Sequence, residues 1–338
     1  MERYKRILGG LTLAAAADSI GTVTETRSMD LIKEYFGGFV RDFRQAPEDT
    51  FARGAEAGLV SDDFSLAYYT ALAIIKNKGV INDKTASDAL LDWAADPRYF
   101  EAFAGPTTKA AVYALQGHPV QGPYPFLACD NAKASNGSAM KIEAVGYIHP
   151  GDLDAAIDDA ITMCMPTHGN DIALSAGCAV AAACAKAMED DADLFSIVEA
   201  GLYGARVGYE KGGKVGKRLA GASVEKRIKL AVSIAMQSES LEDAMREIAA
   251  IIGCGLRANE AVPAAFGLLI AAKGDPVEAI LAAVNMGDDT DTVATIVGSI
   301  AGAYAGIDAL PAHYLTTIDR VNKFDLEGTA KALDALID

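Results

Sequence analysis

A run of small and apolar residues from Val293 to Ile307 restricts the possible folds of this chain more than any other segment. Glycines at positions 298, 302 and 306 recur every four residues, so they share one face of a helix. Membrane helices use the same spacing for close contact, but aspartates stand directly before the run at positions 288, 289 and 291. We therefore expect a soluble helix bundle in which a neighbouring helix packs tightly against the glycine face.

The rest of the chain has the same helical character. Hydrophobic residues make up 51% of the sequence and aromatic residues only 7%. Ala-rich amphipathic runs dominate, and the alternation of Val, Thr and Tyr that is typical of strands is scarce. This pattern favours an all-α fold. Because the 338 residues show no internal repeat and no clear linker, we expect one compact multi-helix domain spanning residues 1–338.

Acidic residues stand at the start of two apolar helices. Asp288, Asp289 and Asp291 precede the glycine-rich helix, and Asp62 and Asp63 follow Ser61 at the start of another. Capping explains one such run, because Ser and Asp accept hydrogen bonds from the first N–H groups of a helix. Carboxylates gathered in one place repel one another unless a cation lies between them, and oxygen ligands suit Mg²⁺, Ca²⁺ or Mn²⁺. The two runs indicate helix ends that converge on a shared metal site, with capped, solvated turns as the alternative.

Five short motifs resemble those of the ADP-ribosylglycohydrolase family, in the family's order and over nearly the whole chain. The family's motifs are Gly-Asp-Ala-Leu-Gly with a later Glu, Thr-Asp-Asp-Thr, Asn-Gly-Ser-Ala-Met-Arg, Thr-His and Gly-Asp-Thr-Asp-Thr. In this sequence they correspond, in order, to residues 17–25, 61–64, 136–141, 167–168 and 288–292. None of the motifs would suffice singly, but five in the right order make a specific match.

The resemblance implies a binuclear Mg²⁺ or Mn²⁺ centre that hydrolyses a glycosidic bond to ribose. It assigns three sets of residues. The metal ligands would be Ser61, Asp62, Asp63, Asp289, Asp291 and Thr292. The catalytic residues would be Glu25, Asp62 and Asp291, with Glu25 either activating the attacking water or binding metal. The residues that bind the phosphate–ribose part of the substrate would be Asn136, Gly137, Ser138, Met140 and His168. Spacing alone would instead favour helix caps at Asn136 or Ser138 and a structural role for His168.

Several positions depart from the family pattern. Ser61 in place of Thr keeps the oxygen ligand, whereas Phe64 removes a hydroxyl and Asp288 adds a charge. Ala17 in place of Gly slightly crowds the first motif, and Lys141 in place of Arg loses a planar two-pronged contact. These departures leave the substrate open. We expect an ADP-ribosylated protein or small molecule, with a ribosylated metabolite or nucleoside cleaved by an N-glycosidase as one alternative and a non-catalytic ligand-binding or structural protein as another.

Charge and hydropathy exclude some partners. A net charge of -16 argues against nucleic acid, which requires a basic surface. No uncharged apolar run is long enough to span a bilayer, so we expect no membrane partner. The first residues imitate a signal peptide, but Asp18 directly after the apolar run favours a first core helix. A monomer or small homo-oligomer is expected.

The cysteine pattern bears on the cellular compartment. The five cysteines form no Cys-x-x-Cys pair, their number is odd, and several lie in apolar runs. This usage is typical of reduced core cysteines, so we expect a cytoplasmic protein. A catalytic Cys164–His168 pair is the alternative, although Met163 and Met165 beside Cys164 favour core packing.

Periodicity also predicts where the helices lie and where they are interrupted. We expect interruptions at residues 117–138, the least regular part of the chain, at 167–171, and at 208–221, a basic and glycine-rich break. Residues 208–214 match Gly-x-x-x-x-Gly-Lys, but Val215 is neither Ser nor Thr and a helix precedes the match, so we reject a P-loop. A solvated loop is expected there, with contact to an anionic substrate as the alternative. Helices are expected near residues 29–35, 64–76, 87–95, 109–115, 152–164, 172–188, 226–236, 241–252, 262–273 and 277–285, with a last one after Pro311.

Overall fold

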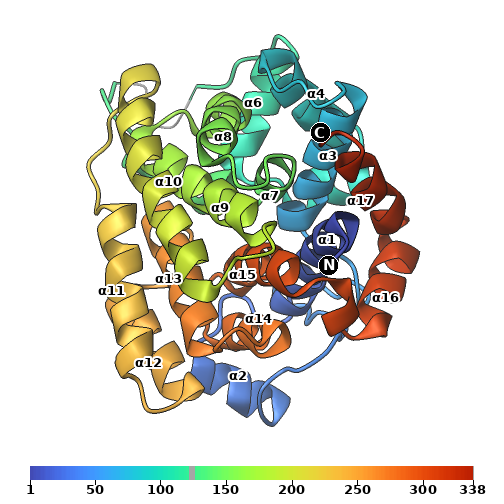
Figure 1. Ribbon diagram of the computed structural model, residues 1–338, viewed down its shortest axis with the longest axis vertical. Helices are drawn as coiled ribbons and strands as arrows, with labels where there is room; N and C mark the ends of the chain where they lie inside the picture. Colours follow the sequence, from blue (N-terminus) through green and yellow to red (C-terminus); the bar gives the residue numbers. More distant parts are fainter. Residues whose placement is uncertain (122–125, 338) are drawn as a thin grey trace.

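The computed structural model describes residues 1–121 and 126–337. Within these residues every regular element is a helix, namely seventeen α-helices and three short 3₁₀ helices (Figure 1). The prediction of an all-α fold is therefore confirmed. No helix in the described part of the chain has the length and apolar character needed to cross a membrane.

Three buried helices form the centre of the bundle: α1 (Arg3–Gly21), α9 (Asp171–Ala187) and α15 (Thr290–Ala305). Helix α15 lies against α1 along the predicted glycine face. A Cβ atom added at Gly298 would come within 2.7 Å of the Leu13 carbonyl oxygen, and one at Gly302 would meet the Gly9 backbone. The tight helix contact predicted from the glycine spacing is present.

The remaining helices surround this centre. Helices α10 and α13 lie along α9, with α11 and α12 outside them, while α16 and α17 cover α1 (Figure 1). The bounds of the first group are α2 Met29–Phe36, α3 Asp62–Lys76, α4 Asp83–Ala94, α5 Pro97–Phe103, α6 Pro106–Leu115, α7 Glu143–Tyr147 and α8 Leu153–His168. Those of the second group are α10 Leu194–Val215, α11 Val224–Gln237, α12 Leu241–Ile251, α13 Ala258–Ala271, α14 Pro276–Asn285, α16 Ala312–Asn322 and α17 Leu326–Asp334.

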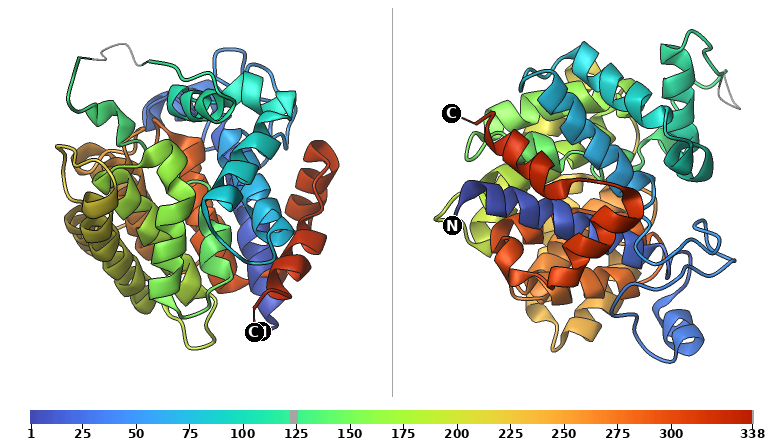
Figure 2. Two further views of the ribbon diagram at one scale, coloured as in Figure 1. Left: turned by 90° about the horizontal axis from the view of Figure 1, so that it is seen from above. Right: turned by 90° about the vertical axis from the view of Figure 1, so that its right-hand side faces the viewer.

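The two ends of the chain lie on the same side of the molecule (Figure 2). The Arg3 guanidinium forms an ion pair with the Asp334 carboxylate at 2.6 Å and donates to the Ile337 carbonyl at 3.0 Å. The first helix and the last helix are thereby joined.

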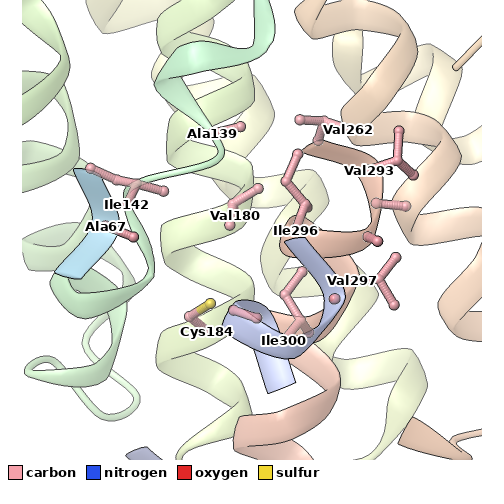
Figure 3. Packing of buried hydrophobic residues seen from close by; sticks show 14 of the residues in the cluster. Ala67, Ala139, Ile142, Val180, Cys184, Val262, Val293, Ile296, Val297 and Ile300 are labelled. Atoms are coloured by element: carbon pink, nitrogen blue, oxygen red, sulfur yellow. The ribbon is translucent and has the colours of Figure 1, made fainter. Parts of the chain in front are cut away.

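The core consists mainly of small and branched aliphatic side chains. Val180 and Cys184 of α9 face Ile296 and Ile300 of α15 (Figure 3), and all four are buried. Small side chains let these helices approach closely, which suits a sequence rich in Ala and poor in aromatics. Four of the five cysteines are buried free thiols, as expected, and Cys129 is exposed.

The predicted break at residues 208–221 is largely wrong. Helix α10 continues to Val215, and only the residues after it leave the helix. Its glycines face α9: a Cβ at Gly204 would meet the Cys178 carbonyl, and one at Gly208 would come within 2.6 Å of the Cys178 Cβ. These glycines permit close helix packing, as in α15, and do not interrupt the helix.

Other helix boundaries also differ from expectation. Helix α8 continues through Pro166 to His168, so the interruption before α9 is confined to Gly169 and Asn170. Helix α5 was not predicted, and two helices, not one, follow Pro311. The irregular segment contains two short 3₁₀ helices, η1 (Asn131–Lys133) and η2 (Asn136–Ser138). Gly122, Pro123 and Pro125 of that segment lie outside the described residues.

Candidate metal centre

The C-terminal end of α1 holds the start of α3. Asp18 is fully buried, and its carboxylate accepts hydrogen bonds from the backbone N–H of Ser61 at 3.0 Å and of Phe64 at 2.9 Å. Ser61 in turn accepts from the Asp63 N–H at 3.1 Å, as a helix cap does. Asp18 therefore fixes the position of the first acidic motif.

The start of α15 lies against the same end of α1. The Thr290 hydroxyl donates to the Gly21 carbonyl at 2.9 Å, and a Cβ at Gly21 would come within 2.7 Å of the Asp291 nitrogen. Only glycine allows this approach. The two helix starts that carry acidic motifs converge, as the sequence predicted, with the end of α1 between them.

Convergence gathers buried carboxylates into two groups. In each group, one carboxylate oxygen from each residue lies within 4.8 Å of those from the others: Asp18, Asp63 and Asp291 form one group, and Glu25, Asp289 and Asp291 the other. Asp291 belongs to both. Within residues 1–121 and 126–337, no lysine, arginine or histidine forms an ion pair with any of these five carboxylates.

Crowding and burial disfavour the ionised form of these carboxylates and so raise their pKa values. Burial, reinforced by the charges of Asp289 and Asp62, raises the pKa of Glu25 to about 8. Burial and the charge of Asp18 raise the pKa of Asp62 to about 7. Burial also raises the pKa of Asp18 itself to about 6, although three hydrogen bonds from Ser61 and Phe64 oppose the shift. Like charges that have been removed from water require a counter-charge or protons.

Two oxygens in this cluster fit a divalent cation in particular. Asp63 Oδ2 and Asp291 Oδ1 are buried and have no hydrogen-bond partner. An unpartnered buried acceptor is costly, whereas a bound cation would satisfy it. The donor set consists of carboxylate and hydroxyl oxygens, which suits a hard ion such as Mg²⁺ or Mn²⁺. The residues present therefore fit the metal that the family resemblance implies.

The other expected metal ligands lie at the edge of the cluster. Thr292 is buried, and its hydroxyl opposes the rise in the pKa of Asp63 and of Asp289. Ser61 is buried as the cap of α3. Asp62 is half-buried and is outside both carboxylate groups, although its charge acts on Glu25 and Asp63.

Glu25 is held in place by an unusual backbone contact. Thr26 and Asp288 both adopt left-handed conformations, with φ of 67° and 62°. The Thr26 N–H donates to the Asp288 carbonyl at 2.8 Å, and the Asp288 N–H donates to the Arg27 carbonyl at 2.9 Å. This pairing locks two strained residues together and sets Glu25 beside Asp289. The Asp288 side chain itself is exposed.

The expected substrate-binding residues adjoin the cluster on one side. The Asn136 amide donates to Asp289 Oδ2 at 2.5 Å, which ties η2 to the acidic cluster. A Cβ at Gly137 would lie 2.8 Å from the His168 ring, so glycine is needed for that ring to approach. Met140 is buried near Gly137. The Ser138 hydroxyl donates to the Ala173 carbonyl of α9 at 2.7 Å and therefore joins two elements.

The alternative of a Cys164–His168 pair finds no support in the geometry. The Cys164 thiol lies 3.4 Å from the Ser138 carbonyl, to which it donates. Burial raises its pKa to about 11, so the thiol stays protonated. The two ring nitrogens of His168 contact Ser135 and Thr167 instead.

Asp18 is the member of the cluster that the sequence analysis did not name as a site residue. It lies in the opening motif, one residue after Ala17, and that position was the available signal. Its importance follows from contacts with Ser61 and Phe64, which only the folded chain brings together.

Comparison with known proteins agrees with this geometry. A family model described as ADP-ribosylglycohydrolase matches residues 1–338. The chain belongs to the ADP-ribosylglycohydrolase family. A solved structure titled "ADP-ribosylglycohydrolase-related protein complex" has the same fold, with a TM-score of 0.66 and 23% identity over 99% of each chain.

Two curated proteins are similar to this chain in sequence. The uncharacterized protein YegU of Escherichia coli (strain K12) is 30% identical over 339 residues, which cover 98% of this chain and 97% of YegU. Human ADP-ribosylhydrolase ARH3 is 31% identical over 90 residues, about a quarter of either chain. Membership of the family supports a glycohydrolase activity in general terms.

Proposed function

We propose that this family member is a metal-dependent hydrolase that cleaves the glycosidic bond between ADP-ribose and an acceptor, either a protein side chain or a small molecule. The observation that carries the proposal is the buried carboxylate cluster without a paired cation, in which Asp63 Oδ2 and Asp291 Oδ1 lack any partner. Two Mg²⁺ or Mn²⁺ ions would supply the missing positive charge. When bound, they would grip the ribose hydroxyls and orient the anomeric carbon.

The protein's own groups would then perform distinct tasks. Asp291, which is common to both carboxylate groups, would contact both ions. Asp18 would keep Asp63 in position through its bonds to the start of α3. Glu25, 8% exposed and beside Asp289, would accept a proton from the attacking water. Nearby carboxylates would stabilise the oxocarbenium-like transition state.

The remainder of the substrate would lie over η2. Asn136 links this segment to Asp289, and His168 lies against Gly137. We propose that Asn136, Gly137, Met140 and His168 form the wall that holds the phosphate–ribose part, with Ser138 fixing the wall to α9.

Release of free ADP-ribose from ADP-ribosyl-arginine tests the proposal. We expect release with Mg²⁺ or Mn²⁺, none after chelation, and a loss of at least about 100-fold in Asp291→Asn, as for a group that stabilises a transition state. Asp92→Asn, an exposed carboxylate on α4, is the matched control and should retain full activity.

Failure on this substrate would separate the alternatives. Metal binding without release would lead to ADP-ribosyl-serine, O-acetyl-ADP-ribose and free nucleosides, and turnover confined to nucleosides would exclude the ADP-ribosyl hydrolase. If the wild-type protein bound no metal in calorimetry, the enzymatic proposal would be abandoned in favour of a ligand-binding or structural protein.

A further inference from the structure

A buried hydrogen-bonded chain runs from Lys141 to the edge of the acidic cluster. The Lys141 ammonium donates to Thr167 Oγ1 at 2.9 Å, Thr167 Oγ1 lies 2.8 Å from His168 Nδ1, and His168 Nε2 lies 2.9 Å from Ser135 Oγ. The chain ends at Ser135, the residue before Asn136. It connects the turn after η2, the end of α8 and the start of η2.

Lys141 is an unusual donor for such a chain. Lys141 is only 3% exposed, and its ammonium group forms no ion pair with any described carboxylate. Burial lowers its pKa. An ammonium group can only donate, so its contact with Thr167 occupies one lone pair of that hydroxyl oxygen. The Thr167 proton must then go to another acceptor.

The distances decide where that proton goes. Thr167 Oγ1 is 2.8 Å from His168 Nδ1 but 3.4 Å from the Cys164 carbonyl. The shorter contact favours donation to Nδ1, which makes Nδ1 the acceptor of a neutral ring and places the ring proton on Nε2. Burial and the charge of Lys141 lower the pKa of His168 to about 3, so the ring is neutral at pH 7.

A proton on Nε2 determines what Ser135 can do. The ring donates to Ser135 Oγ, so the hydroxyl proton of Ser135 remains free for an external acceptor. Ser135 is half-buried, beside the Asn136 that contacts Asp289. If the ring proton were on Nδ1 instead, Ser135 would donate to Nε2 and have no proton left to offer.

We propose that Lys141 is a positioning residue that holds His168 in the Nε2–H tautomer and so commits the Ser135 hydroxyl to donate to a phosphate oxygen of the substrate. The inference rests on the proposed function for the identity of the ligand. A chain of donors that begins at a cation and ends at a hydroxyl favours an anionic acceptor over a neutral ribose hydroxyl. Arg can donate to Thr167 in the same way, so Lys141→Arg should preserve the chain.

Nitrogen NMR of histidine-labelled protein tests the tautomer without any need for turnover. The signals of His168 are assigned by comparison with His168→Gln. We expect a neutral ring protonated at Nε2 in the wild type and in Lys141→Arg, and a population with the proton on Nδ1 in Lys141→Met. Lys229→Met, an exposed change on α11, should leave the signals unchanged. A wild-type ring protonated at Nδ1 would overturn the proposal.

Calorimetric binding of ADP-ribose, with metal present, tests the second half. Ser135→Ala and Lys141→Met should each weaken ADP-ribose about 10- to 100-fold, the range for one hydrogen bond to a charged group, while adenosine binding changes by less than twofold. In kinetics the loss should be in KM and not in kcat, because ground state and transition state share the phosphate contact. Thermal melting establishes that each variant is folded.

The outcomes separate this inference from the proposed function. If wild-type protein hydrolyses ADP-ribosyl-arginine and Ser135→Ala binds ADP-ribose as well as wild type, the inference is wrong and the function stands. If the ring is protonated at Nε2 but wild type binds no ADP-ribose, both the phosphate contact and the ADP-ribosyl function are rejected.

Discussion

Asp291 belongs to both groups of buried carboxylates. Its Oδ1 has no hydrogen-bond partner, and its carboxylate faces Glu25, Asp63 and Asp289. A cation resolves the repulsion among these carboxylates, and so does removal of the charge. A neutral side chain at this position would relieve the repulsion but would no longer offer a charged ligand. Substitution of Asp291 therefore tests the proposed metal site.

We predict that Asp291→Asn makes the metal-free protein more stable than wild type and removes its response to metal. The amide is neutral and relieves the repulsion. At a metal concentration 100 times the Kd, wild type should gain about 2.7 kcal/mol and the variant nothing. Thermal melting in chelator and in Mn²⁺ measures both effects. An equal gain in the two proteins would mean that Asp291 is not a ligand.

Glu143 on α7 should make the stability of the folded protein depend on pH, independently of the candidate metal centre. The residue is 1% exposed, and neither of its carboxylate oxygens has a partner. Burial raises its pKa to about 8. Since the folded protein holds this proton and the unfolded chain releases it near its ordinary value of about 4.3, stability falls as pH rises between those values.

We predict that Glu143→Gln becomes progressively more stable than wild type as pH rises from 5 to 8. The difference should grow by about 1.4 kcal/mol per pH unit, since one proton is involved. Urea unfolding of both proteins across this range measures it. Glu247→Gln, at an exposed position on α12, should show no such trend. A constant difference between Glu143→Gln and wild type would show that the carboxylate is ionised in the fold.

At the scale of helices, the sequence predicted the elements better than their junctions. The glycine spacing of α15 correctly predicted a tight neighbour, because the run contains no charged residue and acidic residues stand directly before it. The same kind of spacing in α10 was read as a break because Lys211 and Lys214 stand among the glycines. Those lysines point outward from α10, where Lys211 pairs with Asp158 of α8 at 2.5 Å. Only the packing of α10 on α9 shows that these glycines form a helix face and do not interrupt the helix.

Two glycines of α10 test this interpretation within one helix. A Cβ at Gly208 would lie 2.6 Å from the Cys178 Cβ, whereas the nearest atom to a Cβ at Gly213 is 3.6 Å away. We predict that Gly208→Ala destabilises the protein by about 1–3 kcal/mol through overpacking. Gly213→Ala should stabilise it by up to about 1 kcal/mol through helix propensity. Denaturant unfolding measures both. If the two variants lost equal stability, the glycine face of α10 would not be a packing surface.

The acidic cluster was predictable only where its residues leave a local signal in the sequence. The sequence pointed to four of its residues, because two helix starts carry more carboxylates than capping requires: Ser61, Asp63, Asp289 and Asp291. Asp18 was not among them, because a lone aspartate near the end of an apolar helix has no local signal beyond its motif. Its bonds to the backbone of α3 arise from tertiary contact. The chain from Lys141 to Ser135 likewise joins three segments and has no sequence pattern of its own.

At the scale of the molecule, we propose that residues 1–338 form one domain that unfolds as a unit. Trp93, the only tryptophan, is fully buried on α4 and donates to Ser65 at 2.9 Å. Helices α11 and α12 lie on the opposite side of the bundle (Figure 1). A local probe at Trp93 should therefore report the same event as a probe of all helices.

We predict that the urea transitions measured by Trp93 fluorescence and by far-ultraviolet circular dichroism coincide, because the central helices are shared by both sides of the bundle. Two separated midpoints would show that the side containing α4 unfolds independently. The measurement should be made in chelator, so that metal does not tie the two sides together.

The distribution of the carboxylates along the chain has a consequence for biosynthesis. Asp18 and Asp63 are synthesised well before Asp291, which belongs to both groups. A nascent chain therefore has only part of the proposed ligand set until Asp291 has been made. If the proposed metal site is correct, tight capture of a cation would be delayed until α15 has docked on α1, and metal loading would then mark a chain whose centre is already assembled.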